Sequence, residues 1–229
     1  MKIYRPIKTN WITQNFGENL ACVKLDSNGN AIRPFQIHRR GFVGSCPVGY
    51  TKLYPVIGMK SHNGIDLGLW HGEPVYHSGD YVGRMKTHID NNGGVGVDIV
   101  SREPLLRDGI DNLEHHIKLR YWHLKSVVGW DDMEVKPGQL IGYGNDTGIS
   151  GGDHLHFGLK PCNSYGVSVH SGNGYFGAIN PDPYYENKFV VEVIEDVKAE
   201  ALSAIQQAQR LIYQVKLFIQ QWNIRLKKE

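Results

Sequence analysis

The chain contains the stretch Gly151-Gly152-Asp153-His154-Leu155-His156-Phe157-Gly158, in which two histidines flank one leucine. The stretch is typical of a β-strand, and side chains along a strand point alternately to its two faces. We therefore expect His154 and His156 to share one face and Leu155 to point into the core. Paired imidazoles of this kind are what a divalent metal ion or an acid–base site requires.

Short runs typical of β-strands fill the chain from Ile12 to about Asn180, separated by glycine, asparagine and aspartate. The chain has 27 glycines, mostly between these runs, and this part shows no helical periodicity. We therefore predict a mainly β fold with an antiparallel folded sheet and an open groove. Further predicted strands lie at Pro74–Tyr76, Tyr81–Met85, Val95–Val100 and Lys118–His123.

The pattern changes near Phe189, and no proline or glycine occurs from Val190 to Glu229. Apolar residues recur there at alternating spacings of three and four, which predicts a long helix with an apolar seam. The predicted domains are residues 1–188 and a C-terminal helix at 189–229. The seam consists of Ile194, Val197, Ala201, Ala204, Ala208, Leu211, Val215, Phe218 and Trp222.

This helix is the part of the chain with two alternative interpretations. A helix of about 40 residues is roughly 60 Å long, which is too long to be hidden on a small β-domain. It can fold back against its own domain, or it can mediate self-association or docking to a larger assembly. We favour the second interpretation, because a continuous apolar stripe usually marks an interface.

Composition restricts the function classes. The chain has 229 residues and a net charge of +2, so electrostatics give no reason to expect a nucleic-acid partner. The N-terminal residues lack the apolar core of a signal peptide, and no stretch has the roughly 20 apolar residues of a membrane span. The three cysteines form no C-x-x-C pair; a Cys22–Cys46 bridge and free thiols are both open.

A second histidine-containing segment is Ser61-His62-Asn63-Gly64-Ile65-Asp66. His62 and Asp66 offer an imidazole and a carboxylate four residues apart, and Gly64 lets the backbone bend so that both can reach one point. With His156 they make three nitrogen and oxygen ligands, which is the arrangement of a catalytic zinc with an open fourth position. His123 and His154 remain for acid–base work.

These motifs resemble the lysostaphin-type (LytM-domain) zinc metallopeptidases of family M23, which cut peptide bonds in bacterial peptidoglycan. The pattern of that family is H-x-x-x-D, then Y-x-H-L, then H-L-H-F. In this chain it occurs in that order as His62-x-x-x-Asp66, Tyr121-Trp122-His123-Leu124 and His154-Leu155-His156-Phe157. The flanking segments 12–17, 135–142 and Thr147-Gly148 also resemble segments of the family.

The resemblance runs from about Ile12 to Pro181, with insertions near residues 18–60 and 107–118. It implies a LytM/lysostaphin-like fold of the duplicated-hybrid-motif type and one Zn²⁺ per chain. It also implies that His62, Asp66 and His156 bind zinc and that His123 and His154 are catalytic. Which of the two catalytic histidines is the acid and which the base stays open. The other histidines, which we expect to be structural or surface residues, are His38, His71, His77, His88, His115, His116 and His170.

The predicted function is a zinc-dependent endopeptidase that hydrolyses the stem peptide or the cross-bridge of peptidoglycan. A wall-cutting domain, an assembly helix and no recognisable signal peptide together suggest a phage lysin or a virion- or tail-associated enzyme. Such an enzyme would reside in the virion, or in the host cytoplasm before lysis. The alternative, from another class, is a catalytically inactive structural or wall-binding protein with the same fold.

Overall fold

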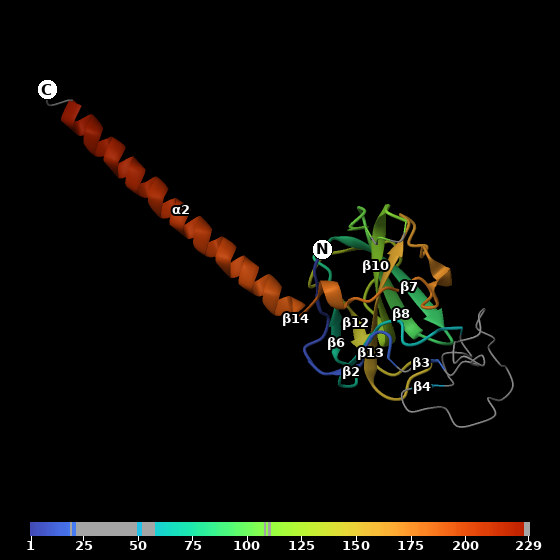
Figure 1. The fold of residues 1–229 in the computed structure, drawn as a ribbon. Coiled ribbons are helices and arrows are strands. Elements are labelled where there is room, and N and C mark those ends of the chain that lie inside the picture. Colours follow the sequence, from blue (N-terminus) through green and yellow to red (C-terminus); the bar gives the residue numbers. More distant parts are fainter. Residues whose placement is uncertain (19, 22–49, 52–57, 108, 110, 227–229) are drawn as a thin grey trace, which may run out of the picture. The chain divides into compact units, whose positions relative to one another are not determined.

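The computed structural model describes residues 1–18, 20–21, 50–51, 58–107, 109 and 111–226 (Figure 1). Cys22 and Cys46, for which a bridge and free thiols were both open, lie outside these ranges, as do His38 and most of the predicted insertion near residues 18–60. The chain divides into two compact units, Met1–Val190 and Val191–Glu229.

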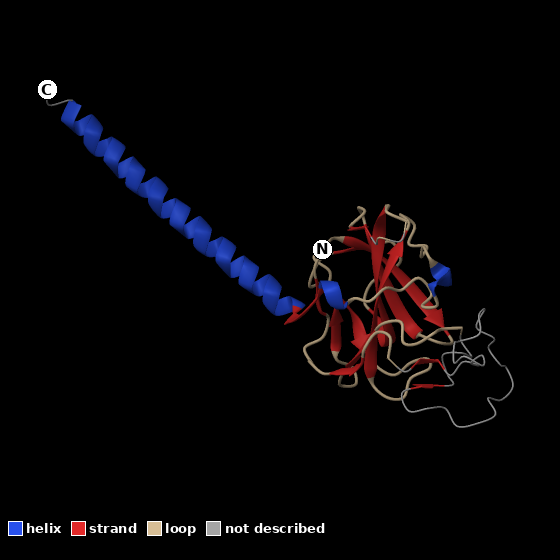
Figure 2. Ribbon diagram, viewed as in Figure 1, coloured by secondary structure: helices blue, strands red, loops and turns tan. Residues whose placement is uncertain are grey.

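One large sheet organises the first unit (Figure 2). Its ten described strands are antiparallel to each of their neighbours, in the order β11-β7-β8-β10-β13-β5-β2, with β12 pairing with β10 and β6, and β9 with β10. The strands are β2 (Ile12–Gln14), β5 (Ile65–Gly68), β6 (Pro74–Tyr76), β7 (Gly83–Asp90), β8 (Gly94–Ser101), β9 (Leu106–Arg107), β10 (Glu114–Val127), β11 (Glu134–Val135), β12 (Leu140–Gly144) and β13 (His154–Cys162).

Smaller elements complete the unit. Two short parallel pairs lie beside the large sheet: β1 (Ile3–Arg5) with β14 (Tyr185–Phe189), and β3 (Leu20–Ala21) with β4 (Tyr50–Thr51). Two single-turn 3₁₀ helices, η1 (Ser171–Asn173) and η2 (Asp182–Tyr184), occur where the sequence suggested no helix. The segment predicted as an insertion at 107–118 includes the hairpin between β9 and β10, whose pairs are Glu114–Arg107 and His115–Leu106.

The two faces of the central strands differ in chemistry because side chains alternate along each strand. Leu119, Tyr121 and Phe157 are fully buried on the core face. The opposite face carries Trp122 and His156, which pair across β10 and β13. This face is polar, and the site described below lies on it.

Charged residues continue along the same polar face and are also buried. Asp98 is 1% exposed, and its two carboxylate oxygens accept hydrogen bonds of 2.8 Å from Nε and Nη2 of Arg120. Lys118 Nζ and His88 Nε2 lie 3.1 Å from the same carboxylate. Burial alone would raise the pKa of Asp98, but the Arg120 guanidinium outweighs it and holds that pKa well below its usual range. Lys160, 3% exposed, is buried on this face too, and burial lowers its pKa to about 7.

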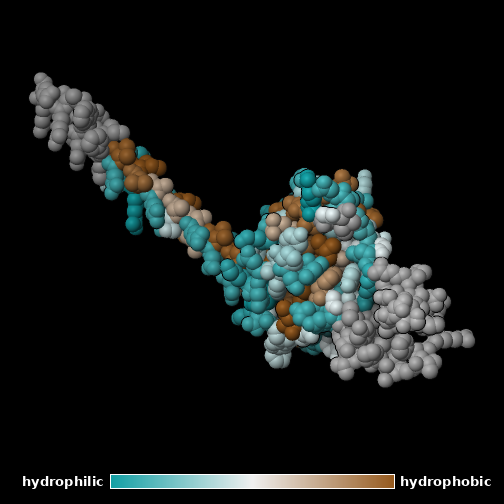
Figure 3. All heavy atoms as spheres, viewed as in Figure 1, coloured by the Kyte–Doolittle hydropathy of each residue, from teal (hydrophilic) through white to brown (hydrophobic). Residues whose placement is uncertain are grey.

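The second unit is a single helix, α2, which begins at Val190, just inside the first unit, and ends at Leu226. The predicted fold class, mainly antiparallel β followed by a long C-terminal helix, is confirmed. Apolar side chains recur along the helix (Figure 3), and the seam residues Val197, Leu211 and Val215 are each more than half exposed. Among the residues that the structure describes, no helix has both the length and the apolar character that crossing a bilayer requires.

The buried hydroxyl of Tyr121 forms hydrogen bonds with Ser78 and His77 inside the core. The hydroxyl accepts a hydrogen bond of 2.9 Å from the backbone N–H of Ser78 and lies 3.0 Å from Ser78 Oγ. His77 Nε2–H donates to the Tyr81 carbonyl, which leaves His77 Nδ1, 3.3 Å away, as a further acceptor for the same hydroxyl. Burial raises the pKa of the Tyr121 hydroxyl well above its usual range, so this hydroxyl stays neutral.

Replacing Tyr121 with phenylalanine should lower the free energy of unfolding by about 1–3 kcal/mol, because the buried Ser78 N–H would lose its partner. Urea denaturation followed by circular dichroism measures this. Tyr165→Phe is the matched control, because Tyr165 is 80% exposed. Equal denaturation midpoints for Tyr121→Phe and the wild type would show that the hydroxyl network contributes nothing net.

Candidate metal and catalytic site

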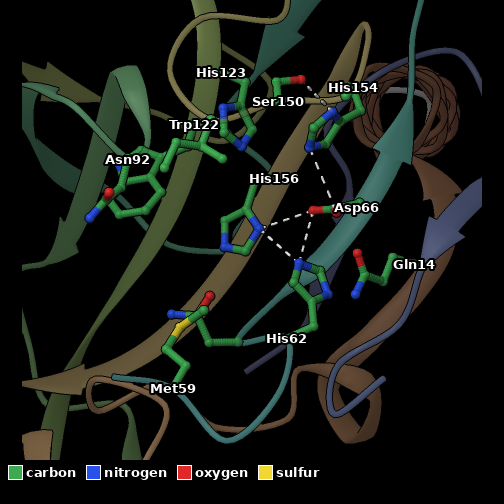
Figure 4. Close-up of a pocket in the computed structure, with 13 residues that line it drawn as sticks. Gln14, Met59, His62, Asp66, Asn92, Trp122, His123, Ser150, His154 and His156 are labelled. Atoms are coloured by element: carbon green, nitrogen blue, oxygen red, sulfur yellow. Dashed lines mark hydrogen bonds and ion pairs between the residues drawn. The ribbon is translucent and has the colours of Figure 1, made fainter. Parts of the chain in front are cut away.

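Strand pairing brings the predicted metal ligands together. His156 on β13 lies directly opposite Asp66 on β5, and His62 precedes β5. Asp66 Oδ1 lies 2.9 Å from His156 Nδ1 and 3.0 Å from His62 Nε2, and the two imidazole nitrogens are 3.0 Å apart. All three residues are buried. The three atoms form a nearly equilateral triangle (Figure 4).

This triangle has the dimensions of a coordination shell. Two ligands that bind a tetrahedral ion at 2.0–2.1 Å lie about 3.3 Å apart. Two imidazoles and one carboxylate are ligands that suit zinc. His62, Asp66 and His156 are therefore a group that could hold a metal ion.

Electrostatics keep these groups in the form that a metal ion needs. Burial alone would raise the pKa of Asp66, but the hydrogen bonds with His156 and His62 outweigh it and lower that pKa below its usual range. Burial lowers the pKa of His156 to about 4, although the Asp66 carboxylate partly opposes it. The carboxyl is thus ionised and the His156 imidazole neutral near pH 7, as metal binding requires.

The orientation of His62 is set by the backbone. Its Nδ1–H donates a hydrogen bond of 3.0 Å to the Asn15 carbonyl, so its Nε2 lone pair faces Asp66. The carbonyl of His62 in turn accepts a hydrogen bond of 2.9 Å from the N–H of Gly17. The segment 12–17, which resembles the peptidase family, therefore holds a predicted metal ligand in place.

His154 and His123 face the same pocket, and their ring centres are 4.5 Å apart. His154 Nδ1–H donates to the Gly152 carbonyl at 2.8 Å, and His123 Nδ1–H donates to the Thr147 carbonyl at 2.6 Å. This leaves the Nε2 of each ring to exchange a proton, and the Nε2 of His154 lies 3.6 Å from Asp66 Oδ2. Burial lowers the pKa of His123, which favours its neutral form. As predicted, His154 and His156 share one face, and Leu155 between them is fully buried.

A β-bulge is what brings His123 into the pocket. Strict alternation would place Trp122 and His123 on opposite faces, yet both line the pocket. The register between β10 and β8 shifts between Tyr121 and Leu124, and His123 has a positive φ of 64°. Bulges of this kind re-aim side chains next to functional sites. The sequence motif identified His123, but its period-two pattern gave no sign of the bulge.

The pocket has a volume of about 360 Å³ and a wall made of Trp122. The ring centres of Trp122 and His156 are 5.8 Å apart. Arg120 Cζ lies over the indole of Trp122, 4.2 Å from its ring centre. Because Asp98 holds Arg120 through two hydrogen bonds, the buried charges of the polar face fix this wall. Sequence reasoning did not single out Trp122. The remaining lining residues are Gln14, Met59, Asn63, Asn92, Ile149, Ser150 and Gly151.

Gly64 has a role other than the predicted one. It is not among the residues with positive φ, so it does not supply an unusual backbone bend. A Cβ at this position would lie 2.6 Å from the Phe157 carbonyl oxygen and 2.7 Å from His156 Cε1. Glycine is needed here because the chain that carries His62 and Asp66 passes directly against His156.

The chain is similar in sequence to known proteins. No protein-family profile matches the chain. The chain is 29% identical over 130 residues to an uncharacterized metalloprotease of Haemophilus influenzae, covering 56% of this chain and 25% of that protein. It is also 29% identical over 125 residues to the peptidoglycan DD-endopeptidase ShyA of Vibrio cholerae, covering 52% and 26%. The chain thus spans about a quarter of the length of these relatives.

Among solved structures, the catalytic domain of lysostaphin from Staphylococcus simulans is 24% identical, with 62% of this chain and 86% of that chain covered and a TM-score of 0.43. The curated relatives confirm that the resemblance read from the motifs is one of homology: this chain has metalloprotease and peptidoglycan endopeptidase homologues.

Replacing Gly64 with alanine should displace His156 and lower the amount of zinc that the protein retains after dialysis. Elemental analysis measures the zinc content, and thermal unfolding reports any loss of stability. Gly151→Ala is the matched control, because a Cβ at Gly151 meets nothing within 4 Å. A Gly64→Ala protein with wild-type zinc content and stability would show that the close approach to His156 is not required.

Proposed function

We propose that this chain is a zinc-dependent endopeptidase that hydrolyses peptide bonds of bacterial peptidoglycan. The observation that carries the proposal is the triangle of His62, Asp66 and His156 with two further imidazoles facing it across one pocket. The homology to a metalloprotease and to a peptidoglycan DD-endopeptidase supports the reaction and the substrate class. We assign the zinc ligands to His62 Nε2, Asp66 Oδ1 and His156 Nδ1.

A zinc ion bound there would lower the pKa of a water ligand to about 7 and polarise the scissile carbonyl. The protein's own part is proton transfer at Nε2 of His123 and His154. A neutral imidazole takes a proton from the attacking water, and an imidazolium returns one to the leaving amine. The backbone carbonyls of Thr147 and Gly152 keep both rings in the tautomer that this transfer needs.

We further propose that the enzyme is a phage lysin or a virion- or tail-associated wall-degrading enzyme, in which α2 provides self-association. The described seam is exposed along the helix, and Ile205 and Ile212, each 55% exposed, widen it on one flank. At 100° per residue these two lie within about a quarter turn of Val197. An apolar stripe of this width on an isolated helix indicates a partner helix.

Alanine substitution should separate metal binding from catalysis. His156→Ala should lose zinc, because two protein ligands hold it poorly. His123→Ala and His154→Ala should keep zinc and reduce the rate of muropeptide release from purified sacculi by about 10²–10⁴-fold. Elemental analysis and mass spectrometry of the released muropeptides are the two measurements. His71→Ala serves as the control for an exposed histidine.

Two outcomes would contradict this assignment. Loss of zinc from His154→Ala would reverse the roles within the H-x-H pair. A zinc-loaded wild type that releases no muropeptide from several wall types would favour the inactive wall-binding alternative.

Removal of α2 should abolish self-association and leave the wall-hydrolysing activity intact. The truncation should end after Val190, because β14 extends to Phe189 and Val190 is fully buried. Light scattering should show an oligomer for the full chain and a monomer for the truncated chain. In the full chain, Val197→Lys and Leu211→Lys should also give monomers, whereas Gln206→Lys, on the opposite side of the helix, should not. A strictly monomeric full chain, with a truncation that unfolds, would show that α2 completes the domain's own core.

A further inference from the structure

A second group of ligand-type side chains lies away from the pocket. Asp111 precedes β10, His115 is on β10, and His170 immediately precedes η1. One ligand atom from each lies within 4.8 Å of the other two. His115 and His123 are eight residues apart on β10, which corresponds to about 26 Å along a strand. This cluster is therefore separate from the site in the pocket.

The carboxylate of Asp111 is held between the two imidazoles. Its Oδ1 lies 2.9 Å from His115 Nε2, and its Oδ2 lies 3.5 Å from His170 Nε2. The two rings are perpendicular, with centres 5.6 Å apart. The backbone N–H of Leu113 donates to Asp111 Oδ1 at 2.9 Å and fixes the carboxylate from the other side.

The distance from Asp111 to His170 suits a shared ion better than a hydrogen bond, whereas His115 Nε2, 2.9 and 3.1 Å from the two carboxylate oxygens, is at hydrogen-bond distance. A separation of 3.5 Å is long for an N–H···O hydrogen bond, whose usual length is about 2.9–3.0 Å. It is close to the distance of about 3.3 Å between two ligands of a tetrahedral zinc. The donor set, two imidazoles and one carboxylate, has the same composition as the one in the pocket.

We propose that Asp111, His115 and His170 bind a second divalent transition-metal ion, with zinc as the ion that this donor set suits best. The role of this ion is structural. It ties Asp111, which precedes β10, to His170 in the segment that follows β13. The proposal does not depend on the peptidase activity.

The loop that carries His170 also reaches the pocket. Five residues further on, the carbonyl of Tyr175 accepts a hydrogen bond of 3.3 Å from Asn63 Nδ2, and its hydroxyl lies 3.2 Å from Ser61 Oγ. Gly174 accepts a hydrogen bond of 2.9 Å from the N–H of Lys60. The loop therefore supports the segment that presents His62. An ion at His170 would anchor this support at its far end.

Calorimetric titration of the full-length apoprotein with zinc chloride tests the proposal by counting sites. The wild type should bind two ions per chain. His115→Ala and His170→Ala should each bind one, His156→Ala should bind one, and the double variant His115→Ala/His156→Ala should bind none. His116→Ala is the matched control, because His116 is next to His115 on β10 but directs Nδ1 to the Ser101 carbonyl at 2.9 Å. It should bind two.

Thermal unfolding provides a second readout that needs no activity. In His156→Ala, added zinc should still raise the melting temperature, because ligand binding to the folded state stabilises it. Adding Asp111→Asn to that variant should remove the effect while keeping the size of the side chain. A His170→Ala protein with the wild-type number of sites, or a His156→Ala protein whose melting temperature does not respond to zinc, would overturn the proposal.

Discussion

The pairing of β13 between β10 and β5 is the constraint on which the rest of the structure depends. In the observed register His156 faces Asp66 on one side and Trp122 on the other. A slip of one residue would turn His154 and His156 into the core and would expose Leu155 and Phe157. Since Leu155 and Phe157 are fully buried, the hydrophobic core itself enforces the register that assembles the site. Stability and site geometry are thus set by the same strand.

The polar face of the sheet shows how this arrangement is maintained away from the pocket. Several charged groups are buried there around one carboxylate, Asp98, and burying a charge is costly unless it is paired. Arg120 satisfies both carboxylate oxygens, and Lys118 Nζ and Lys160 Nζ donate to the carbonyls of Gly166 and Phe176. The loop after β13 therefore covers this face through its backbone oxygens, and the Arg120 guanidinium is left flat against Trp122. The paired charges behind the wall of the pocket thus hold Arg120 against Trp122.

Sequence reasoning was successful where a single periodicity or motif was sufficient. The alternation at 154–159 predicted which side chains share a face, and the unbroken run after Val190 predicted α2. It could not predict the bulge at His123, because a bulge depends on pairing with β8 and not on the residue pattern of β10. It placed His115 and His170 among the structural or surface residues, and it could not show the contact of His170 with Asp111, because these two residues are far apart in the sequence. The role of Gly64 was misread for the same reason: glycine is needed there because β13 passes too close to leave room for a Cβ.

The choice of hydrogen-bond partners for the imidazoles has a chemical consequence. His62, His123 and His154 all donate Nδ1–H to backbone carbonyls, those of Asn15, Thr147 and Gly152. A carbonyl fixes the tautomer and the ring orientation as a carboxylate would, but it carries no net charge that would stabilise the protonated ring. For His123, burial then outweighs this hydrogen bond, and its pKa is lowered. At this position the backbone acceptor therefore aims the imidazole at the pocket and leaves it neutral, which is the state in which it can accept a proton.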